Sequence, residues 1–113
     1  MKKLYFYNAK ILNVVDGDTV DALIDLGFKV TITLRLRFNG IDTSELHSSD
    51  PELRERANKA KAFVTENLLN KEVVLQTYKA DKYGRYLADI YLIDDTVSIN
   101  TKLLNEGLAV VYK

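Results

Sequence analysis

Cysteine is absent from the 113 residues, and there is a single histidine. A disulfide framework, a thiol nucleophile and a cysteine-based zinc site are therefore excluded. One histidine also argues against a multi-histidine metal site and a Ser-His-Asp triad. A single proline and five glycines argue against a disordered chain. No apolar run approaches the roughly 18 residues that a membrane helix needs, so we expect no membrane association.

An excess of charge of either sign is absent too, since 16 lysine and arginine residues balance 16 aspartate and glutamate residues. A domain that holds nucleic acid by bulk charge usually has an isoelectric point above about 9. The overall charge therefore does not support a nucleic-acid partner, and any such role must depend on local placement. At roughly 100–200 residues per domain, the length predicts a single domain over residues 1–113.

The apolar pattern of the N-terminal third indicates three strands. Residues 9–15 and 20–26 form two of them, separated by an acidic turn in which Gly17 supplies permissive backbone. Apolar and polar residues then alternate over residues 28–38, which predicts a long strand with one face in a core. Gly40 ends this run, and residues 41–45 are expected to form the loop after it.

The rest of the chain is a helix, two strands and a second helix. Pro51 suits the first helical position with Asp50 as the cap, although Ser49 and Glu52 also fit a capping box. The helix reaches about Leu69, and its apolar face consists of Leu53, Ala57, Ala60, Val64 and Leu68.

The remaining elements are strands near residues 72–78 and 85–93, a short helix near residues 98–106 and an extended tail over residues 108–112. Gly107 ends the second helix as a left-handed cap. This order predicts a mainly β fold with helices (α+β). The fold expected is a five-stranded OB-type barrel with one helix between strands 3 and 4 and a short helix after strand 5.

Several charged residues at strand ends and in loops have the chemistry of a phosphodiesterase. The carboxylates of Asp18, Asp42 and Glu45, with neighbouring backbone or hydroxyl oxygens, are suited to a hard cation such as calcium, which prefers oxygen ligands. Arg37 and Arg85 are suited to a phosphate, because a guanidinium group donates paired hydrogen bonds to phosphoryl oxygens. A carboxylate that the metal does not use would then be available as a base towards water.

Simpler interpretations of the same residues stay open at this point. An Asp-Gly sequence is mostly turn chemistry, and a lone arginine on the polar face of a strand is usually solvated or paired across strands. Arg35 and Arg37 share that face of the third strand. His47 is expected to be a solvated loop residue. Spacing alone does not show that the charged groups converge.

Three ordered motifs resemble the staphylococcal nuclease (thermonuclease) family: residues 16–19 (Asp-Gly-Asp-Thr), residues 37–45 (Arg-Phe-Asn-Gly-Ile-Asp-Thr-Ser-Glu) and residues 81–85 (Asp-Lys-Tyr-Gly-Arg). With the intervening helix and residues 105–109, the resemblance covers nearly the whole chain. Each motif is weak alone, but the ordered set is specific.

The resemblance implies a role for each matching residue. Asp18, Asp42 and the Thr43 carbonyl match the calcium ligands, and Asp16 matches an acid just outside them. Arg37 and Arg85 match the two arginines on the scissile phosphate, which leaves Arg35 as a surface or cross-strand charge. Glu45 matches the acid usually assigned as general base. Lys82 and Tyr83 match residues beside the nucleotide phosphate, and Tyr112 resembles a tyrosine that lines the nucleotide pocket.

The family resemblance implies a calcium-dependent nuclease that cleaves DNA and RNA with little sequence preference and leaves 3′-phosphate ends. Single-stranded or frayed nucleic acid is the expected partner, and the protein is expected to be a monomer. Secretion would follow from the family, but the first ten residues lack the apolar segment of a signal peptide, so the compartment stays open.

The sequence departs from the family at several points. Ser44 stands where the family usually has proline, so the loop that holds Glu45 loses a fixed φ angle. Residues 46–51 are short and acidic where the family often has a longer basic loop. The founding members also continue beyond the point matching Lys113 into another helix.

Two further classes of function are weighed against the nuclease. One is a catalytically silent module of the same fold that binds nucleic acid or protein, and the other is a purely structural barrel. Retention of Asp18, Arg37, Asp42, Glu45 and Arg85 favours the nuclease.

Overall fold

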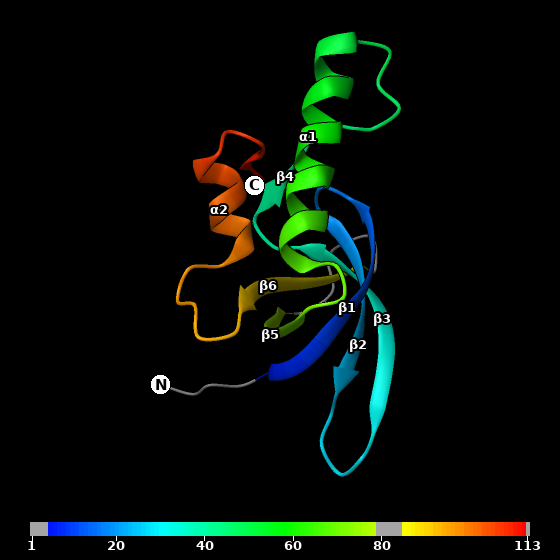
Figure 1. Cartoon of the computed structure of the whole chain (residues 1–113), viewed down its shortest axis with the longest axis vertical. Helices are drawn as coiled ribbons and strands as arrows, with labels where there is room; N and C mark the ends of the chain where they lie inside the picture. The colour runs from blue at the N-terminus through cyan, green and yellow to red at the C-terminus, as the bar shows by residue number, and fades with distance from the viewer. Residues whose placement is uncertain (1–4, 79–84, 113) are drawn as a thin grey trace.

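The computed structural model describes residues 5–78 and 85–112, which build a small barrel with two helices (Figure 1). The barrel strands are β1 (Phe6–Asp16), β2 (Thr19–Asp25), β3 (Thr31–Phe38), β5 (Glu72–Tyr78) and β6 (Tyr86–Leu92). They close in the order β1-β2-β3-β6-β5, with β3 and β6 parallel and the other pairs antiparallel. The predicted fold class, a five-stranded OB-type barrel, is confirmed.

The helices also occupy the predicted places in the chain order. Helix α1 (Pro51–Leu68) lies between β3 and β5, and helix α2 (Ile99–Asn105) follows β6. The barrel interior and the helix faces that cover it form one hydrophobic cluster. Its largest fully buried members are Phe38, Ile11, Leu36, Ile41, Leu68, Leu75, Ile90, Ile99 and Leu103. No helix in the described ranges is long and apolar enough to cross a membrane.

The third strand begins at Thr31, so the prediction of a strand from residue 28 is wrong. Gly27, Phe28 and Lys29 have φ angles of +82°, +54° and +62°, which place the turn between β2 and β3 there. The Val30 amide donates to the Gly27 carbonyl at 2.9 Å. Phe28 is fully exposed, because the β2–β3 hairpin extends beyond the barrel (Figure 1). The apolar side chains of this alternating pattern are therefore buried only in the second half of the strand.

Helix α1 begins as the sequence predicts. The Asp50 side chain accepts a hydrogen bond from the Glu52 amide at 2.9 Å, and Pro51 occupies the first turn, where it removes no intrahelical hydrogen bond. Leu53 does not belong to the buried face, since 41% of it is exposed. The first turns of α1 stand clear of the barrel (Figure 1). The face that packs on the core consists of Ala57, Ala60, Val64 and Leu68.

Helix α2 ends at Gly107 in the predicted left-handed conformation, with a φ angle of +72°. The Leu108 amide donates to the Leu103 carbonyl at 2.9 Å and the Gly107 amide to the Leu104 carbonyl at 3.1 Å. These two hydrogen bonds form a Schellman motif, which satisfies carbonyls at the helix end and turns the chain back towards the barrel.

Asn100 fastens α2 to the barrel. It is buried, its side-chain oxygen accepts from the Ile90 amide at 3.1 Å, and its nitrogen donates to the Asn39 carbonyl at 2.9 Å and the Ala88 carbonyl at 3.1 Å. One amide side chain thus joins the helix to β6 and to the end of β3.

Two short strands complete the structure and hold the loop after β3. Strand β4 (Ile41–Asp42) pairs antiparallel with β7 (Val110–Val111). The prediction of a loop at Ile41 and Asp42 is therefore wrong, because their pairing partner lies about 70 residues away and leaves no mark on the local pattern. The pairing fixes the backbone of Asp42.

Candidate active site

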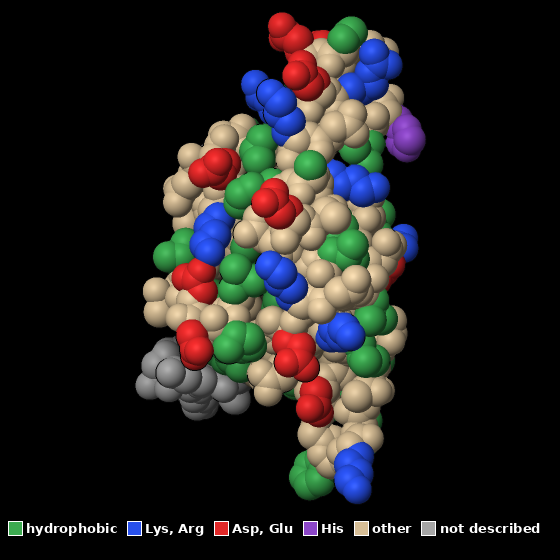
Figure 2. Space-filling model, in the orientation of Figure 1, with side chains coloured by type: hydrophobic (Ala, Val, Ile, Leu, Met, Phe, Trp, Pro, Cys, Tyr) green, Lys and Arg blue, Asp and Glu red, His purple; other side chains and the backbone are tan. Residues whose placement is uncertain are grey.

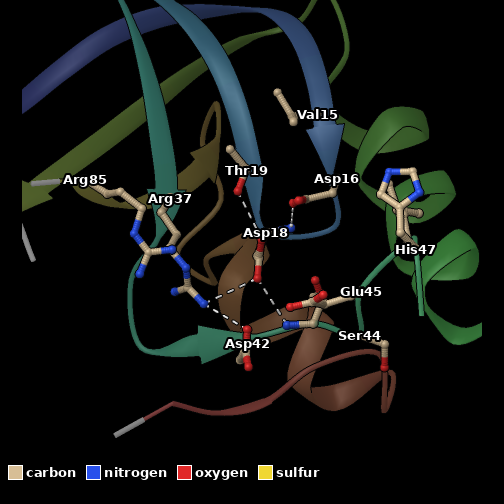
Figure 3. A pocket seen from close by; sticks show the side chains of 12 residues that line it. Val15, Asp16, Asp18, Thr19, Arg37, Asp42, Ser44, Glu45, His47 and Arg85 are labelled. Atoms are coloured by element: carbon tan, nitrogen blue, oxygen red, sulfur yellow. Dashed lines mark hydrogen bonds and ion pairs between the residues drawn. The ribbon is translucent and has the colours of Figure 1, made fainter. Parts of the chain in front are cut away.

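A pocket of about 320 Å³ opens where the β1–β2 turn, the end of β3 and the loop after β4 meet (Figure 3). The residues that line it include most of the predicted site: Asp16, Asp18, Arg37, Asp42, Thr43, Glu45 and Arg85. Segments far apart in the sequence thus bring these side chains together.

The β1–β2 turn positions the first two acids. Asp16 and Thr19 form the last strand pair, and the Asp18 amide donates to the Asp16 carboxylate at 3.0 Å. The Thr19 hydroxyl donates to Asp18 Oδ1 at 3.1 Å. Gly17 is needed for space and not for a left-handed φ angle, since a Cβ atom there would lie 2.7 Å from the Cβ of Ala60 on α1. The turn is therefore seated directly on the helix.

Arg37 links the two predicted metal-binding carboxylates. Its Nη2 atom lies 3.4 Å from Asp18 Oδ2 and 2.9 Å from Asp42 Oδ1, while Nη1 donates to the Ile41 carbonyl at 3.0 Å (Figure 3). The guanidinium group also lies over the Tyr112 ring, 4.8 Å from its centroid. Arg37 therefore joins the segment that carries Asp42 to Asp18 in the β1–β2 turn.

This part of the pocket is built into the protein interior. Asp18 is 8% exposed and Arg37 is 6% exposed, and Thr43 is buried beside them. The Thr43 amide donates to Asp18 Oδ2 at 3.2 Å. In the described ranges the only other buried polar residues are Ser98 and Asn100, both of which serve α2. Burial of a charged cluster is unfavourable unless its members are paired, and here every member has partners.

The pKa values of the three acids diverge because they share one site. Burial, and then the neighbouring Asp18, raise the pKa of Asp16 to about 6. Burial and the charge of Asp18 also raise the pKa of Asp42. Burial alone would raise the pKa of Asp18 as well, but hydrogen bonds from Asp16 and the Thr43 amide and the charge of Arg37 hold it below its ordinary value. Among these three acids, Asp18 is thus the one whose charged form its surroundings favour.

The donor set fits a hard cation in its chemistry. Asp18 and Asp42 both lie beside Nη2 of Arg37, and oxygen ligands are what calcium prefers, so an ion that took both carboxylates would displace this guanidinium nitrogen from between them. Across the described residues, no three or more acidic, histidine or cysteine side chains are grouped so as to hold a metal ion. An ion at this place would therefore take two carboxylates, with its other ligands from backbone, water or substrate.

Glu45 and Arg85 complete the walls of the pocket. Glu45 comes from the loop after β4, and its carboxylate points towards Asp18 (Figure 3). Arg85 is exposed and immediately precedes β6, whose parallel pairing with β3 brings it to the wall formed by Arg37. The pocket thus has acids on one side and guanidinium groups on the other.

The remaining predicted residues have different outcomes. Lys82 and Tyr83 lie outside the described residues. Tyr112 contacts Arg37 through its ring and is held by a backbone hydrogen bond to Gly40 at 2.9 Å. Its place in a nucleotide pocket stays a prediction. Arg35 is confirmed as a cross-strand charge, since its Nε atom lies 2.8 Å from Asp21 Oδ1 on β2.

Five further residues line the pocket without having been predicted as site residues: Val15, Thr19, Ser44, Leu46 and His47. Thr19 and Ser44 lie within the family motifs. Val15 and Leu46 carry no chemical signal of a site. His47 was predicted to be an exposed loop residue, and it is exposed, but the loop turns it to the pocket rim (Figure 3).

Comparison with known proteins decides the family. The family described as staphylococcal nuclease homologue matches residues 35–113. The chain belongs to the staphylococcal nuclease family. A thermonuclease of Staphylococcus intermedius is 36% identical over 101 residues, covering 88% of this chain and 56% of that protein.

Two other relatives illustrate the spread of the family. An uncharacterised protein of Methanocaldococcus jannaschii is 33% identical over 128 residues, covering 94% of this chain and 59% of that protein. A probable endonuclease of Paracoccidioides lutzii is 31% identical over 86 residues, covering 72% of this chain and 25% of that protein. The chain spans at most about three fifths of the length of these relatives. Membership of the nuclease family supports a nuclease-type function.

Proposed function

We propose that the protein is a calcium-dependent nuclease that hydrolyses phosphodiester bonds of DNA and RNA with little sequence preference. The observation that supports this most strongly is the Asp18–Arg37–Asp42 cluster, in which Asp18 and Arg37 are buried and which opens into the pocket that Glu45 and Arg85 also line. The pocket thus combines carboxylates for a cation, guanidinium groups for a phosphate, and a carboxylate for the base.

The arginines would bind and orient the scissile phosphate. Guanidinium groups donate paired hydrogen bonds to phosphoryl oxygens, and these bonds strengthen as negative charge builds in the transition state. Arg37 is held in place by carboxylates and backbone carbonyls, so its donors are oriented before substrate arrives. Arg85 on the same wall would contact the phosphate from the solvent side.

Glu45 would act as the general base. It would take a proton from the attacking water as the bond from the water oxygen to phosphorus forms. The bond from phosphorus to the 5′ oxygen breaks, and that oxygen takes up a proton. The products are a 3′-phosphate end and a 5′-hydroxyl end. Ser44 precedes Glu45 without the fixed φ angle of proline, so the position of the base depends on the loop around it.

Asp18, Asp42 and the Thr43 carbonyl would hold calcium, with Asp16 just outside them. When bound, a divalent cation neutralises charge on the phosphate. Lys82, Tyr83 and Tyr112 are proposed to contact the nucleotide. Because the chain has no net charge, binding should rest on a few phosphate contacts, and its salt dependence should be shallow.

The proposal is tested by incubating single-stranded DNA and RNA with the purified protein in millimolar calcium and, in parallel, in a chelator. We expect cleavage in calcium alone, with 3′ ends that a polymerase extends only after phosphatase treatment. Asp42→Asn should abolish the calcium response. Asp94→Asn removes the same charge from an exposed turn and should preserve it.

The alternative of a catalytically silent binding module makes the opposite prediction. A folded protein that binds single-stranded DNA but leaves it intact at all calcium concentrations would exclude the nuclease and favour that module. Ser44 would then be the first position to restore to proline.

A further inference from the structure

A second cleft adjoins the candidate active site. It encloses about 300 Å³ and is lined by Thr19, Arg35, Arg37, Arg85 and Tyr86. Thr19, Arg37 and Arg85 also line the first pocket, so the two hollows adjoin. The wall between them, formed by Arg37 and Arg85, is called the arginine wall. Arg35 and Tyr86 are the residues that this cleft adds.

Arg35 is accessible and yet oriented. It lies directly opposite Asp21 in the β2–β3 register, and its Nε and Nη2 atoms contact the two oxygens of that carboxylate at 2.8 and 3.2 Å. Even so, 63% of the Arg35 side chain is exposed. The carboxylate therefore fixes the plane of the guanidinium group while one edge faces solvent.

Tyr86 provides an aromatic surface next to these cations. It is the first residue of β6 and pairs with Leu36 of β3. About half of Tyr86 is exposed, so its ring is not part of the barrel core. Its place at the strand end, directly after Arg85, holds the ring at the rim of the arginine wall.

We propose that this cleft binds the nucleotide next to the scissile phosphate of a single-stranded substrate. Tyr86 stacks on the base and Arg35 contacts the adjoining phosphate, because single-stranded nucleic acid is held by cations along its backbone and aromatic rings against its bases. This inference rests on the proposed nuclease function, and it assigns to Arg35 and Tyr86 a substrate role beyond the catalytic cluster.

Binding in a chelator, where no cleavage occurs, tests the inference separately from catalysis. The probe is a fluorescently labelled oligothymidylate of eight nucleotides, measured by anisotropy at several salt concentrations. Loss of one stacked base corresponds to about 1–3 kcal/mol, so Tyr86→Ala should weaken binding by about fivefold or more. Arg35→Ala should also weaken it, and should reduce the slope of log K against log salt by about 0.7.

Tyr86→Ala and Arg35→Ala are thus expected to differ in the salt dependence of binding. Tyr86→Ala should leave the salt slope unchanged, because stacking releases no counterions. Tyr86→Phe should bind as the wild type does, since the ring alone is required. Phe28→Ala and Lys29→Ala are matched controls, because they remove an exposed aromatic and an exposed cation from the hairpin tip at the other end of β2 and β3 (Figures 1 and 2). Both should bind normally.

Each outcome bears on one claim. Equal affinity of wild type, Tyr86→Ala and Arg35→Ala overturns the proposed cleft, even if the protein is an active nuclease. Equal loss in the hairpin-tip controls overturns it as well. Binding that depends on Tyr86, in a protein that never cleaves, supports the cleft and rejects the nuclease. In an active enzyme, Arg35→Ala should raise the KM of an octanucleotide and leave that of a dinucleotide unchanged, because a dinucleotide has no second phosphate for Arg35 to contact.

Discussion

Replacing Gly17 by alanine tests the seating of the β1–β2 turn on helix α1. A Cβ atom at residue 17 would lie 2.7 Å from the Cβ of Ala60, 3.0 Å from the Thr43 hydroxyl oxygen and 3.2 Å from the Thr43 Cβ. The Cβ of Ala60 cannot rotate away, because it is fixed to the helix backbone. The turn must therefore move, and Asp18 moves with it.

Two opposing effects set the magnitude. An extra methyl group forced into a packed interior costs about 1–3 kcal/mol. Alanine also reduces the freedom of the unfolded chain, which stabilises by about 0.4–1 kcal/mol where the φ angle suits it, as it does at Gly17. The steric effect is larger, so Gly17→Ala should lower the free energy of unfolding by about 1–2 kcal/mol. At about 2.1 cal/mol/K of unfolding entropy per residue, this corresponds to a fall in Tm of about 4–8 °C.

A double-mutant cycle with Ala60→Gly separates the steric effect from a general weakening of the turn. Glycine inside a helix costs about 1 kcal/mol by itself, but it removes the atom that the new methyl group meets. The double variant should therefore be more stable than the sum of the single effects, by about 1 kcal/mol. The contact with Thr43 limits the rescue, because it is present in both backgrounds.

Urea unfolding of the four proteins is the assay. The reasoning is refuted if Gly17→Ala is as stable as the wild type. It is refuted equally if the two substitutions add within about 0.3–0.5 kcal/mol, because independent sites behave that way. Nuclease activity of Gly17→Ala should also fall, since the Thr43 amide and the β1–β2 turn together hold Asp18.

Three further predictions concern the buried Arg37, the buried Asn100 and two tyrosines whose pKa values are raised. Arg37→Ala should lower the free energy of unfolding by about 3–5 kcal/mol, since it leaves the buried Asp18 without its cation. Arg35→Ala should lower it far less, because Arg35 is exposed, and equal losses in urea unfolding would contradict this. Asn100→Ala should lower the free energy of unfolding by about 2–3 kcal/mol, because the Ile90 amide and the Ala88 carbonyl each lose a hydrogen-bond partner. A decrease below about 0.5 kcal/mol would show that other contacts hold α2. Burial and the neighbouring Asp89 raise the pKa values of Tyr78 and Tyr91 in the folded state. Unfolded tyrosine titrates at pH about 10, so the stabilisation that these two neutral hydroxyls provide is complete below that pH. It is lost as the pH rises further. The urea midpoint should fall above that pH, less steeply in Tyr78→Phe, and a constant midpoint would count against the prediction.

The sequence predicts those parts of the fold that depend on local patterns. Asp50 and Gly107 mark helix boundaries through hydrogen bonds within a few residues, and both were predicted correctly. The alternation over residues 28–38 identified the third strand but not its start. Alternation indicates which residues share a face, and it contains no information on whether the barrel extends far enough to cover that face.

Long-range packing decided what the sequence could not predict. Gly17 was expected to supply backbone freedom, and the structure shows that it makes room for Ala60, a residue 43 positions away. The pairing of Asp42 with Val110 is equally remote. The candidate site residues were proposed through ordered family motifs, because spacing alone gives no reason for Asp18, Arg37 and Asp42 to meet. Arg35 and Tyr86 match none of those motifs, and only the shared cleft draws attention to them.

The rate of single-stranded DNA cleavage by Arg85→Ala, measured in millimolar calcium against the wild type, tests whether this pocket is the active site. Arg85 is exposed, so its removal should leave the fold intact, unlike removal of the buried Arg37. Arg54→Ala, which removes an exposed arginine from α1, is the matched control. We expect the rate of Arg85→Ala to fall by at least about 10²–10³-fold, because a transition-state donor is lost, and Arg54→Ala to retain full activity. A folded Arg85→Ala variant that cleaves DNA at the wild-type rate would contradict the assignment of this pocket as the active site.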